Sequence, residues 1–250
     1  MNPIQITPIP AFNDNYIWTL HQNQQAVVVD PGDAAPVLAF LKTHGLSLNA
    51  LLLTHHHADH IGGVADLLSH YPDCPVYGPE SIALVTHAVA EPNAINTVFG
   101  AFNVLDIPGH TADHLGFIWQ ETPTQAHVFC GDTLFSAGCG RVFTGTYAQL
   151  FDSLNKLKAL PHNTLFYPAH EYTRSNLHFT EKVDPGNPDV AAALAYCDQH
   201  PVSLPTSLAK ERLINPFLRT DNAHIAATIG LADADEFARF QSLREFKNQG

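Results

Sequence analysis

A stretch of seven residues, 54–60, contains four histidines and one aspartate in the order Thr-His-His-His-Ala-Asp-His. Imidazole nitrogens and carboxylate oxygens are common ligands of divalent metals in proteins. His55 and His57 are two residues apart, so in an extended chain their side chains point to the same side and can bind one ion. His56 should then point the other way, and we do not count it as a ligand. The spacing therefore predicts a metal site.

The residues on either side of this stretch indicate how it is positioned. An apolar run at 51–53 is typical of the end of a buried strand, and 61–64 begins a helical pattern. A ligand loop between a strand and a helix lies where α/β sheets present their chemistry, at the carboxyl ends of the strands. Asp59 and His60 follow the expected bend and could bind a second ion. A histidine-rich surface tract is the alternative, but the order of the ligands favours a metal site.

Three further residues share one context, in which an apolar strand is followed directly by a possible ligand on a turn of small residues. They are His110, Asp132 and His170. Each alone is a weak signal, because buried histidines and turn aspartates are more often structural. Added to the four side chains of the first stretch they give seven ligands, enough for two adjacent metals that share one carboxylate. An all nitrogen and oxygen ligand set suits zinc, iron and manganese about equally.

The composition restricts the class of protein. The chain has 250 residues, of which 45% are hydrophobic and 14% charged, against roughly 25% charged in an average soluble protein. A formal net charge of −12 argues against a nucleic-acid partner. The four cysteines form no Cys-x-x-Cys pair, and we expect reduced thiols. The first ten residues lack a signal-peptide pattern, and no apolar run approaches a membrane span. These features predict a soluble cytoplasmic protein with no membrane partner.

Hydrophobic periodicity predicts a mixed α/β domain over residues 1–173 and a small helical domain over 174–250. From about Ser175 onward we expect no strand. Two sets of strands with helices between them indicate two stacked sheets flanked by helices. We expect strands at 4–6, 16–20, 26–29, 48–53, 75–77, 95–99, 102–107, 115–119, 127–130 and 164–167. We expect helices at 34–44, 64–70, 81–90, 147–160, 189–199, 207–213, 223–229 and 233–246.

The motifs around these ligands resemble a known superfamily. The His-x-His-x-Asp-His stretch, together with 109–111, 131–135 and His170, resembles the metallo-β-lactamase superfamily, which has an α/β fold, the αββα sandwich. Within it, four later motifs resemble the bacterial type of glyoxalase II, the hydroxyacylglutathione hydrolase family. These motifs lie at 137–141, 170–173, 211–219 and 243–247. The likeness covers nearly the whole chain, including the helical C-terminal part.

This resemblance implies two divalent metal ions, zinc foremost, with iron or manganese as alternatives. It divides the seven ligands into three sets: His55, His57 and His110 on one ion, Asp59, His60 and His170 on the other, and Asp132 bridging both. Asp59 and Asp132 are thereby the candidate catalytic carboxylates. Two metal ions about 3.5–4 Å apart can lower the pKa of a shared water to about 7 and supply the hydroxide nucleophile.

The resemblance also implies a substrate, a glutathione thioester of a 2-hydroxy acid such as S-D-lactoylglutathione. The residues expected to contact glutathione are Arg141, Phe143, Tyr172, Arg244 and Lys247. Phe143 stands where animal members carry tyrosine, which removes one hydroxyl contact. Thr144 replaces an acidic residue common in the bacterial branch, and the sequence does not explain it. For Arg244 and Lys247, which we expect to be partly exposed, the alternative is a solvated helix end whose cations complement the helix dipole.

Thioester hydrolysis fits the residues that the sequence offers. The leaving thiolate has a conjugate acid with a pKa of about 8.5, so it departs without a proton donor. No separate general acid can be identified, and no Gly-x-Ser-x-Gly motif provides a competing nucleophile. The expected product is a 2-hydroxy acid, as in methylglyoxal detoxification. A glutathione persulfide dioxygenase with a single iron, a metal-storage protein and a nuclease are the alternatives, and the acidic charge disfavours the last. We expect a monomer.

Overall fold

The computed structural model describes residues 3–249. The chain divides into two compact units, which we describe separately. Unit 1 contains the residues up to Asp106 together with Asp113–Gly131, and unit 2 contains Ile107–Ala112 and the residues from Asp132 onward. The predicted boundary at residue 173 is a sequence boundary, and it stays a prediction.

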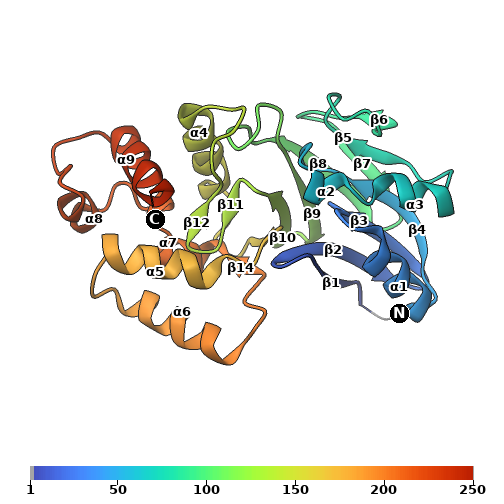
Figure 1. The fold of residues 1–250 in the computed structure, drawn as a ribbon, viewed down its shortest axis with the longest axis horizontal. Coiled ribbons are helices and arrows are strands. Elements are labelled where there is room, and N and C mark those ends of the chain that lie inside the picture. The colour runs from blue at the N-terminus through green and yellow to red at the C-terminus, as the bar shows by residue number, and fades with distance from the viewer. Residues whose placement is uncertain (1–2, 250) are drawn as a thin grey trace. The chain divides into compact units, whose positions relative to one another are not determined.

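The first sheet of unit 1 carries the histidine-rich stretch at the end of one of its strands (Figure 1). Its strands, in spatial order, are β1 (Gln5–Ala11), β2 (Asn15–Gln22), β3 (Gln25–Val29), β4 (Ser47–Leu52), β5 (Val76–Gly78) and β6 (His87–Ala88). Strands β1, β2 and β3 pair antiparallel, whereas β3, β4, β5 and β6 pair parallel. The sheet is therefore mixed, and the parallel strand β4 ends just before His55.

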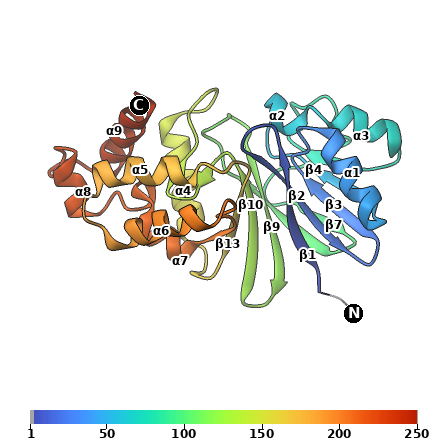
Figure 2. The same cartoon turned by 60° about the horizontal axis from the view of Figure 1, so that its bottom comes forward.

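Helices α1 (Ala34–His44), α2 (Ala58–Ile61) and α3 (Val64–His70) accompany this sheet. The Asp33 side chain caps the start of α1, and Gly45 ends it with a left-handed backbone (φ 61°). Figure 2 shows α1 and α3 on one side of the first sheet and strands β9 and β10 on its other side. Leu41 of α1 and Leu67 of α3 are buried in one core with Leu51 of β4. Burial of these faces fixes the loop that follows β4.

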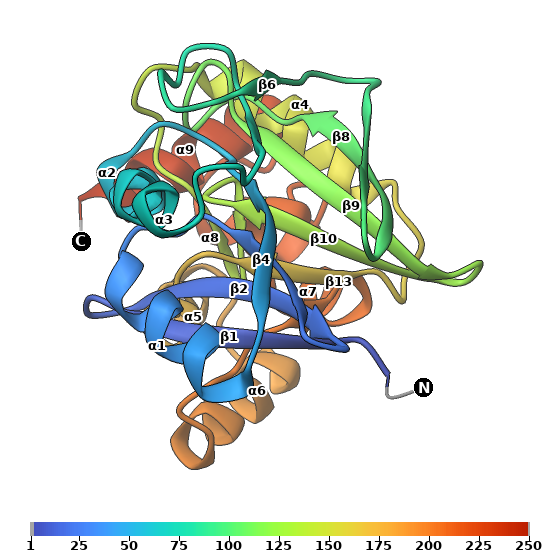
Figure 3. The same ribbon diagram turned by 90° about the vertical axis from the view of Figure 1, so that its right-hand side faces the viewer.

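The second set of strands in unit 1 forms an antiparallel ladder, β7 (Ala94–Thr97), β8 (Gly100–Asp106), β9 (Leu115–Thr122) and β10 (Gln125–Gly131). Figure 3 shows β8, β9 and β10 side by side. Their buried phenylalanines include Phe102, Phe117 and Phe129. The helix predicted at 81–90 is wrong: this segment is an irregular loop that ends in β6. Its apolar spacing is compatible with a helix, but residues 87 and 88 pair with β5 and Thr86 Oγ1 accepts a hydrogen bond from Val76 N (2.9 Å), so contacts with the sheet hold the segment extended.

The first two strands of unit 2 form a short hairpin, β11 (Leu134–Phe135) paired with β12 (Gly138–Cys139). Helix α4 (Tyr147–Lys158) follows and starts with a capping box between Thr146 and Gln149. Leu150, Leu154 and Leu157 form its buried face, as the spacing predicts. Strand β13 (Leu165–Pro168) pairs antiparallel with β14 (Thr206–Ser207) and leads to His170.

The rest of unit 2 is mainly helical. Its elements are α5 (Thr173–Val183), α6 (Pro188–Gln199), α7 (Leu208–Ile214), the 3-10 helix η1 (Pro216–Leu218), α8 (Ala223–Thr228) and α9 (Glu236–Asn248). The helices predicted for α6, α7, α8 and α9 are confirmed. Helix α5 was not predicted, and the expectation of no strand after Ser175 is wrong, because β14 pairs with β13. None of the helices among residues 3–249 has the length and apolar composition needed to cross a membrane.

Candidate metal centre

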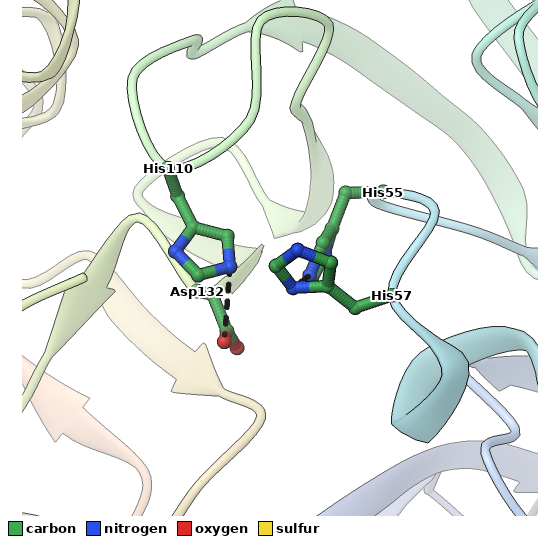
Figure 4. Close-up of side chains that lie close together, drawn as sticks. All are labelled: His55, His57, His110 and Asp132. Carbon is green, nitrogen blue, oxygen red and sulfur yellow. Dashed lines mark hydrogen bonds and ion pairs between the residues drawn. The ribbon is translucent and has the colours of Figure 1, made fainter. Parts of the chain in front are cut away.

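His55 and His57 follow β4 and bring two ring nitrogens together. Nε2 of His55 lies 3.1 Å from Nδ1 of His57, and the ring centroids are 4.6 Å apart. Figure 4 shows the two rings beside each other. His56 lies off this pair, with its side chain 40% exposed and Nδ1 3.7 Å from Asp113. As predicted for an extended chain, His55 and His57 bring two ring nitrogens together, whereas the His56 side chain lies apart from them.

Asp30, directly after β3, orients the second part of the histidine-rich stretch. Its buried carboxylate accepts hydrogen bonds from Thr54 N (2.8 Å) and Thr54 Oγ1 (2.6 Å), and lies 3.0 Å from Nδ1 of His60. The contact with the carboxylate places the proton on Nδ1 of His60, so Nε2 is the atom that can bind a metal. Donor atoms of Asp30, His55 and His60 all lie within 4.8 Å of one another. The one sequence signal for Asp30 was its position at the end of a β-branched strand.

Asp59 lies in α2, two residues after His57. Its Oδ2 accepts a hydrogen bond from Asn15 Nδ2 (3.0 Å) and lies 3.5 Å from Nε2 of His60. The carboxylate and the imidazole predicted for one ion are therefore neighbours. His114, which the sequence did not single out, is fully buried and stacks on His55 with ring centroids 4.7 Å apart.

Unit 2 contains the three remaining predicted ligands, and a carboxylate lies between two imidazoles. Asp132 Oδ2 is 3.4 Å from Nε2 of His110, and Asp132 Oδ1 is 3.4 Å from Nε2 of His170. Figure 4 shows the ring of His110 pointing toward Asp132. The backbone carbonyl of Arg141 accepts a hydrogen bond from Nδ1 of His110 (2.8 Å), so Nε2 is the atom that could bind a metal. All three ligands are buried.

The donor sets of both units fit a divalent metal. Each set combines imidazole nitrogens with carboxylate oxygens, and contains no thiolate. Outer partners such as Asp30 and the Arg141 carbonyl fix the ring orientation, as they do in protein metal sites. The chain therefore holds histidine and aspartate side chains that are able to bind metal ions.

The residues predicted to contact glutathione all lie in unit 2, in different environments. The Tyr172 ring stacks on His170, with centroids 4.7 Å apart and planes 6° apart. Phe143 is 61% exposed and meets the His110 ring edge to face, with centroids 5.2 Å apart. The Arg141 side chain is exposed. Phe143 is therefore a surface residue next to a predicted metal ligand.

Arg244 and Lys247 on α9 are less exposed than expected. Arg244 is 2% exposed, and its Nη1 donates to the carbonyls of Cys139 (2.7 Å) and Gly140 (3.4 Å). The Lys247 ammonium donates to Asn176 Oδ1, and lies 5.4 Å from the centre of an aromatic ring on α5. Burial, and next the Arg244 charge, lower the pKa of Lys247 to about 7. A solvated helix end is therefore excluded for Arg244.

Thr144, which the sequence left unexplained, and Arg239 on α9 both have structural partners. Thr144 Oγ1 accepts a hydrogen bond from Ala112 N (3.1 Å), two residues after His110. Arg239 donates to the backbone carbonyls of Thr220, Leu231 and Ala232. Arg239 thus ties α9 to the loops around α8. The four cysteines are free thiols, as expected.

The chain is similar to known proteins along its whole length. Residues 13–170 match the family described as metallo-β-lactamase superfamily, and residues 171–250 match the family described as hydroxyacylglutathione hydrolase C-terminus. The hydroxyacylglutathione hydrolase of Cupriavidus metallidurans is 46% identical, and that of Aliivibrio salmonicida 47% identical, each over 98% of both chains. The crystal structure of ETHE1 from Myxococcus xanthus is 25% identical, covers 97% of this chain and 89% of its own, and has a TM-score of 0.67.

These matches confirm the predicted α/β class, with mixed sheets flanked by helices and a helical C-terminal region. They also confirm the resemblance on which the hydrolase assignment rested. The first match ends at residue 170 and the second begins at residue 171, so the boundary between them directly follows His170, the last predicted metal ligand. The chain is an enzyme that belongs to the hydroxyacylglutathione hydrolase family of the metallo-β-lactamase superfamily.

Proposed function

We propose that this enzyme hydrolyses S-(2-hydroxyacyl)glutathione thioesters, such as S-D-lactoylglutathione, to glutathione and a 2-hydroxy acid. The observation that carries the proposal is the similarity of 46–47% over 98% of the chain to proteins named for this reaction. The histidine and aspartate donors after β4 and before β11 support it, because thioester hydrolysis on this fold needs a metal-activated water. The proposed domains remain 1–173 and 174–250.

The proposed centre uses the two donor sets together. In it, His55, His57 and His110 hold one ion, Asp59, His60 and His170 hold the other, and Asp132 bridges them. The ions are divalent and in our proposal zinc, with iron or manganese fitting the same donors. When bound, they supply Lewis acidity and a hydroxide at neutral pH.

The protein side chains then have defined tasks. Asp30 and the carbonyl of Arg141 keep the rings of His60 and His110 oriented. The glutathione part of the substrate would lie against Arg141, Phe143, Tyr172 and Lys247. No proton donor is required for the leaving thiolate, because its conjugate acid has a pKa of about 8.5.

A thiol-release assay tests the proposal against a glutathione persulfide dioxygenase. The purified enzyme should release free thiol from S-D-lactoylglutathione, and a chelator should stop the release. Oxygen uptake with glutathione persulfide, without thioester hydrolysis, would show that the dioxygenase assignment is right. The relatives named hydroxyacylglutathione hydrolase favour the first result.

Phe143→Tyr should lower KM for S-D-lactoylglutathione. A neutral hydrogen bond contributes about 0.5–1.5 kcal/mol, which corresponds to a roughly two- to tenfold lower KM. Because Phe143 is 61% exposed, the added hydroxyl is solvated and should not change the melting temperature. Steady-state kinetics should show an unchanged kcat, since the bond is made at the glutathione end.

A truncated thioester without the glutathione part is the control for this variant. It should gain nothing from Phe143→Tyr. An equal gain with both substrates would place the new hydroxyl at the acyl end and remove Phe143 from the proposed glutathione contacts.

Lys247 should make substrate binding depend on pH near neutrality. Its pKa is lowered to about 7, so raising the pH through 7 removes the ammonium charge. A neutral amine attracts the anionic substrate less, and KM should therefore rise with pH across this range. In Lys247→Met this rise should be absent, and KM at pH 6 should resemble that of the wild type at pH 8. A variant that keeps the wild-type profile would show that another group titrates.

We also propose a cytoplasmic monomer with no nucleic-acid or membrane partner. The four free thiols and the net charge of −12 support this assignment.

A further inference from the structure

The hairpin β11–β12 connects Asp132 to the helical part of unit 2. Gly140 follows the hairpin, and its backbone N–H donates to the Thr133 carbonyl (3.2 Å). A Cβ at Gly140 would lie 2.0 Å from the carbonyl oxygen of Asp132, so the two backbones are in close contact. The next carbonyl, that of Arg141, orients the ring of His110. The base of the hairpin therefore carries one proposed metal ligand and orients a second.

The tip of the hairpin is buried among the helices of unit 2. Ala137 at the tip has a left-handed backbone (φ 56°), which is unfavourable for a residue with a side chain. Its methyl group is fully buried in a cluster with Leu177 of α5, Val190 of α6 and Ile214 of α7. The helices thus enclose the tip, and the unfavourable conformation persists because its surroundings enforce it.

Glu211 of α7 is the polar group that fixes this tip. Its carboxylate is fully buried and accepts four hydrogen bonds. The donors are Ser136 Oγ (2.9 Å), Ala137 N (2.8 Å), Thr206 Oγ1 (2.6 Å) and Asn215 Nδ2 (3.0 Å). Two of these donors belong to the hairpin tip. A buried carboxylate is costly unless it is fully hydrogen-bonded, and this one is.

Asn215 extends the same network to the strands of the hairpin. Its Nδ2 also lies within hydrogen-bond distance of the carbonyls of Phe135 (3.2 Å) and Gly138 (2.9 Å). Both strands and the tip are therefore held by Glu211 of α7 and by Asn215, the residue that follows α7. Nothing in the proposed reaction requires the carboxylate of Glu211 to contact substrate.

We propose that Glu211 is a positioning residue, which holds Asp132 and the Arg141 carbonyl in place for metal binding by fixing the β11–β12 hairpin. The inference rests on the proposed metal centre. Rigid support of this kind matters because changes in the outer partners of a metal site typically lower metal affinity about 10–100-fold.

The test compares the zinc affinity of three full-length variants with that of the wild type, by competition with a chromophoric chelator. Glu211→Ala removes all four acceptor contacts, whereas Glu211→Gln keeps the shape of the side chain. The glutamine oxygen can accept from Ala137 N and Asn215, and its amide can donate to the hydroxyls of Ser136 and Thr206. Leu41→Ala, in the core of unit 1, controls for loss of stability alone.

Glu211→Ala should bind zinc at least about tenfold more weakly, and Glu211→Gln within about threefold of the wild type. Leu41→Ala should be destabilised with unchanged zinc affinity. If Glu211→Ala does not fold, Ser136→Ala, which removes a single hairpin contact, should show a smaller loss of affinity. Wild-type zinc affinity in a folded Glu211→Ala, or failing that in Ser136→Ala, overturns the inference. If instead the wild type binds no metal and hydrolyses no thioester, the proposed function itself fails.

Discussion

Replacing Asp132 with alanine should lower kcat/KM for S-D-lactoylglutathione by on the order of a thousandfold or more. The carboxylate lies 3.4 Å from Nε2 of both His110 and His170. Without it, two cations would face each other without a shared anion. A thousandfold loss corresponds to about 4 kcal/mol of transition-state stabilisation, a reasonable share for a metal centre.

Metal analysis and steady-state kinetics on the same preparation measure this effect. Asp233→Ala, an exposed aspartate in the loop before α9, is the matched control and should keep both metals and full activity. The Asp132→Ala protein should contain fewer than two ions per chain. A folded Asp132→Ala enzyme with wild-type rates would refute the bridging role.

Arg244→Ala should lower the free energy of unfolding by about 2–4 kcal/mol. The sequence predicted a partly exposed side chain, and that expectation is wrong, because Arg244 is 2% exposed. Its guanidinium donates to the carbonyls of Cys139 and Gly140 and lies 5.3 Å from the centre of the Phe217 ring. A hydrogen bond from a charged donor contributes about 1.5–3 kcal/mol, and the variant also leaves a cavity. Urea unfolding at pH 7 measures the loss.

Lys247→Ala is the comparison for this variant. Burial lowers the pKa of Lys247 to about 7, which means that its charged form is penalised in the folded protein. Because the folded pKa lies below the ordinary 10.5, this penalty is fully present below pH 7 and is relieved as the pH rises. Removing the ammonium should therefore cost much less stability than removing the guanidinium. Equal losses in both variants would contradict the structural role of Arg244.

The proposed metal ligands could be singled out from sequence because their signals are local. His55 and His57 alternate directly after an apolar strand, and each of the other ligands follows a strand or begins a helix. The main helices were predictable for the same reason, since Leu150, Leu154 and Leu157 repeat at helical spacing. The family resemblance then supplied the proposed division of these ligands between two ions, which no spacing could give.

The residues that support the ligands could not be predicted, because their partners are distant in sequence. Asp30 contacts Thr54 and His60, and Glu211 contacts Ser136, more than seventy residues away. Helix α5 was not predicted because polar residues such as Arg174 and Glu181 interrupt its apolar pattern. Its buried face is recognisable only from its packing within unit 2. Burial of Arg244 was likewise invisible, since arginine is mostly exposed in proteins.

Titration of the metal-free enzyme with zinc, while hydrolysis of S-D-lactoylglutathione is recorded as free thiol, tests the central proposal most directly. We expect activity to rise until about two ions per chain are bound, the number that seven ligands with one bridging carboxylate require. Full activity at one ion per chain, or two bound ions with no thioester hydrolysis, would contradict it.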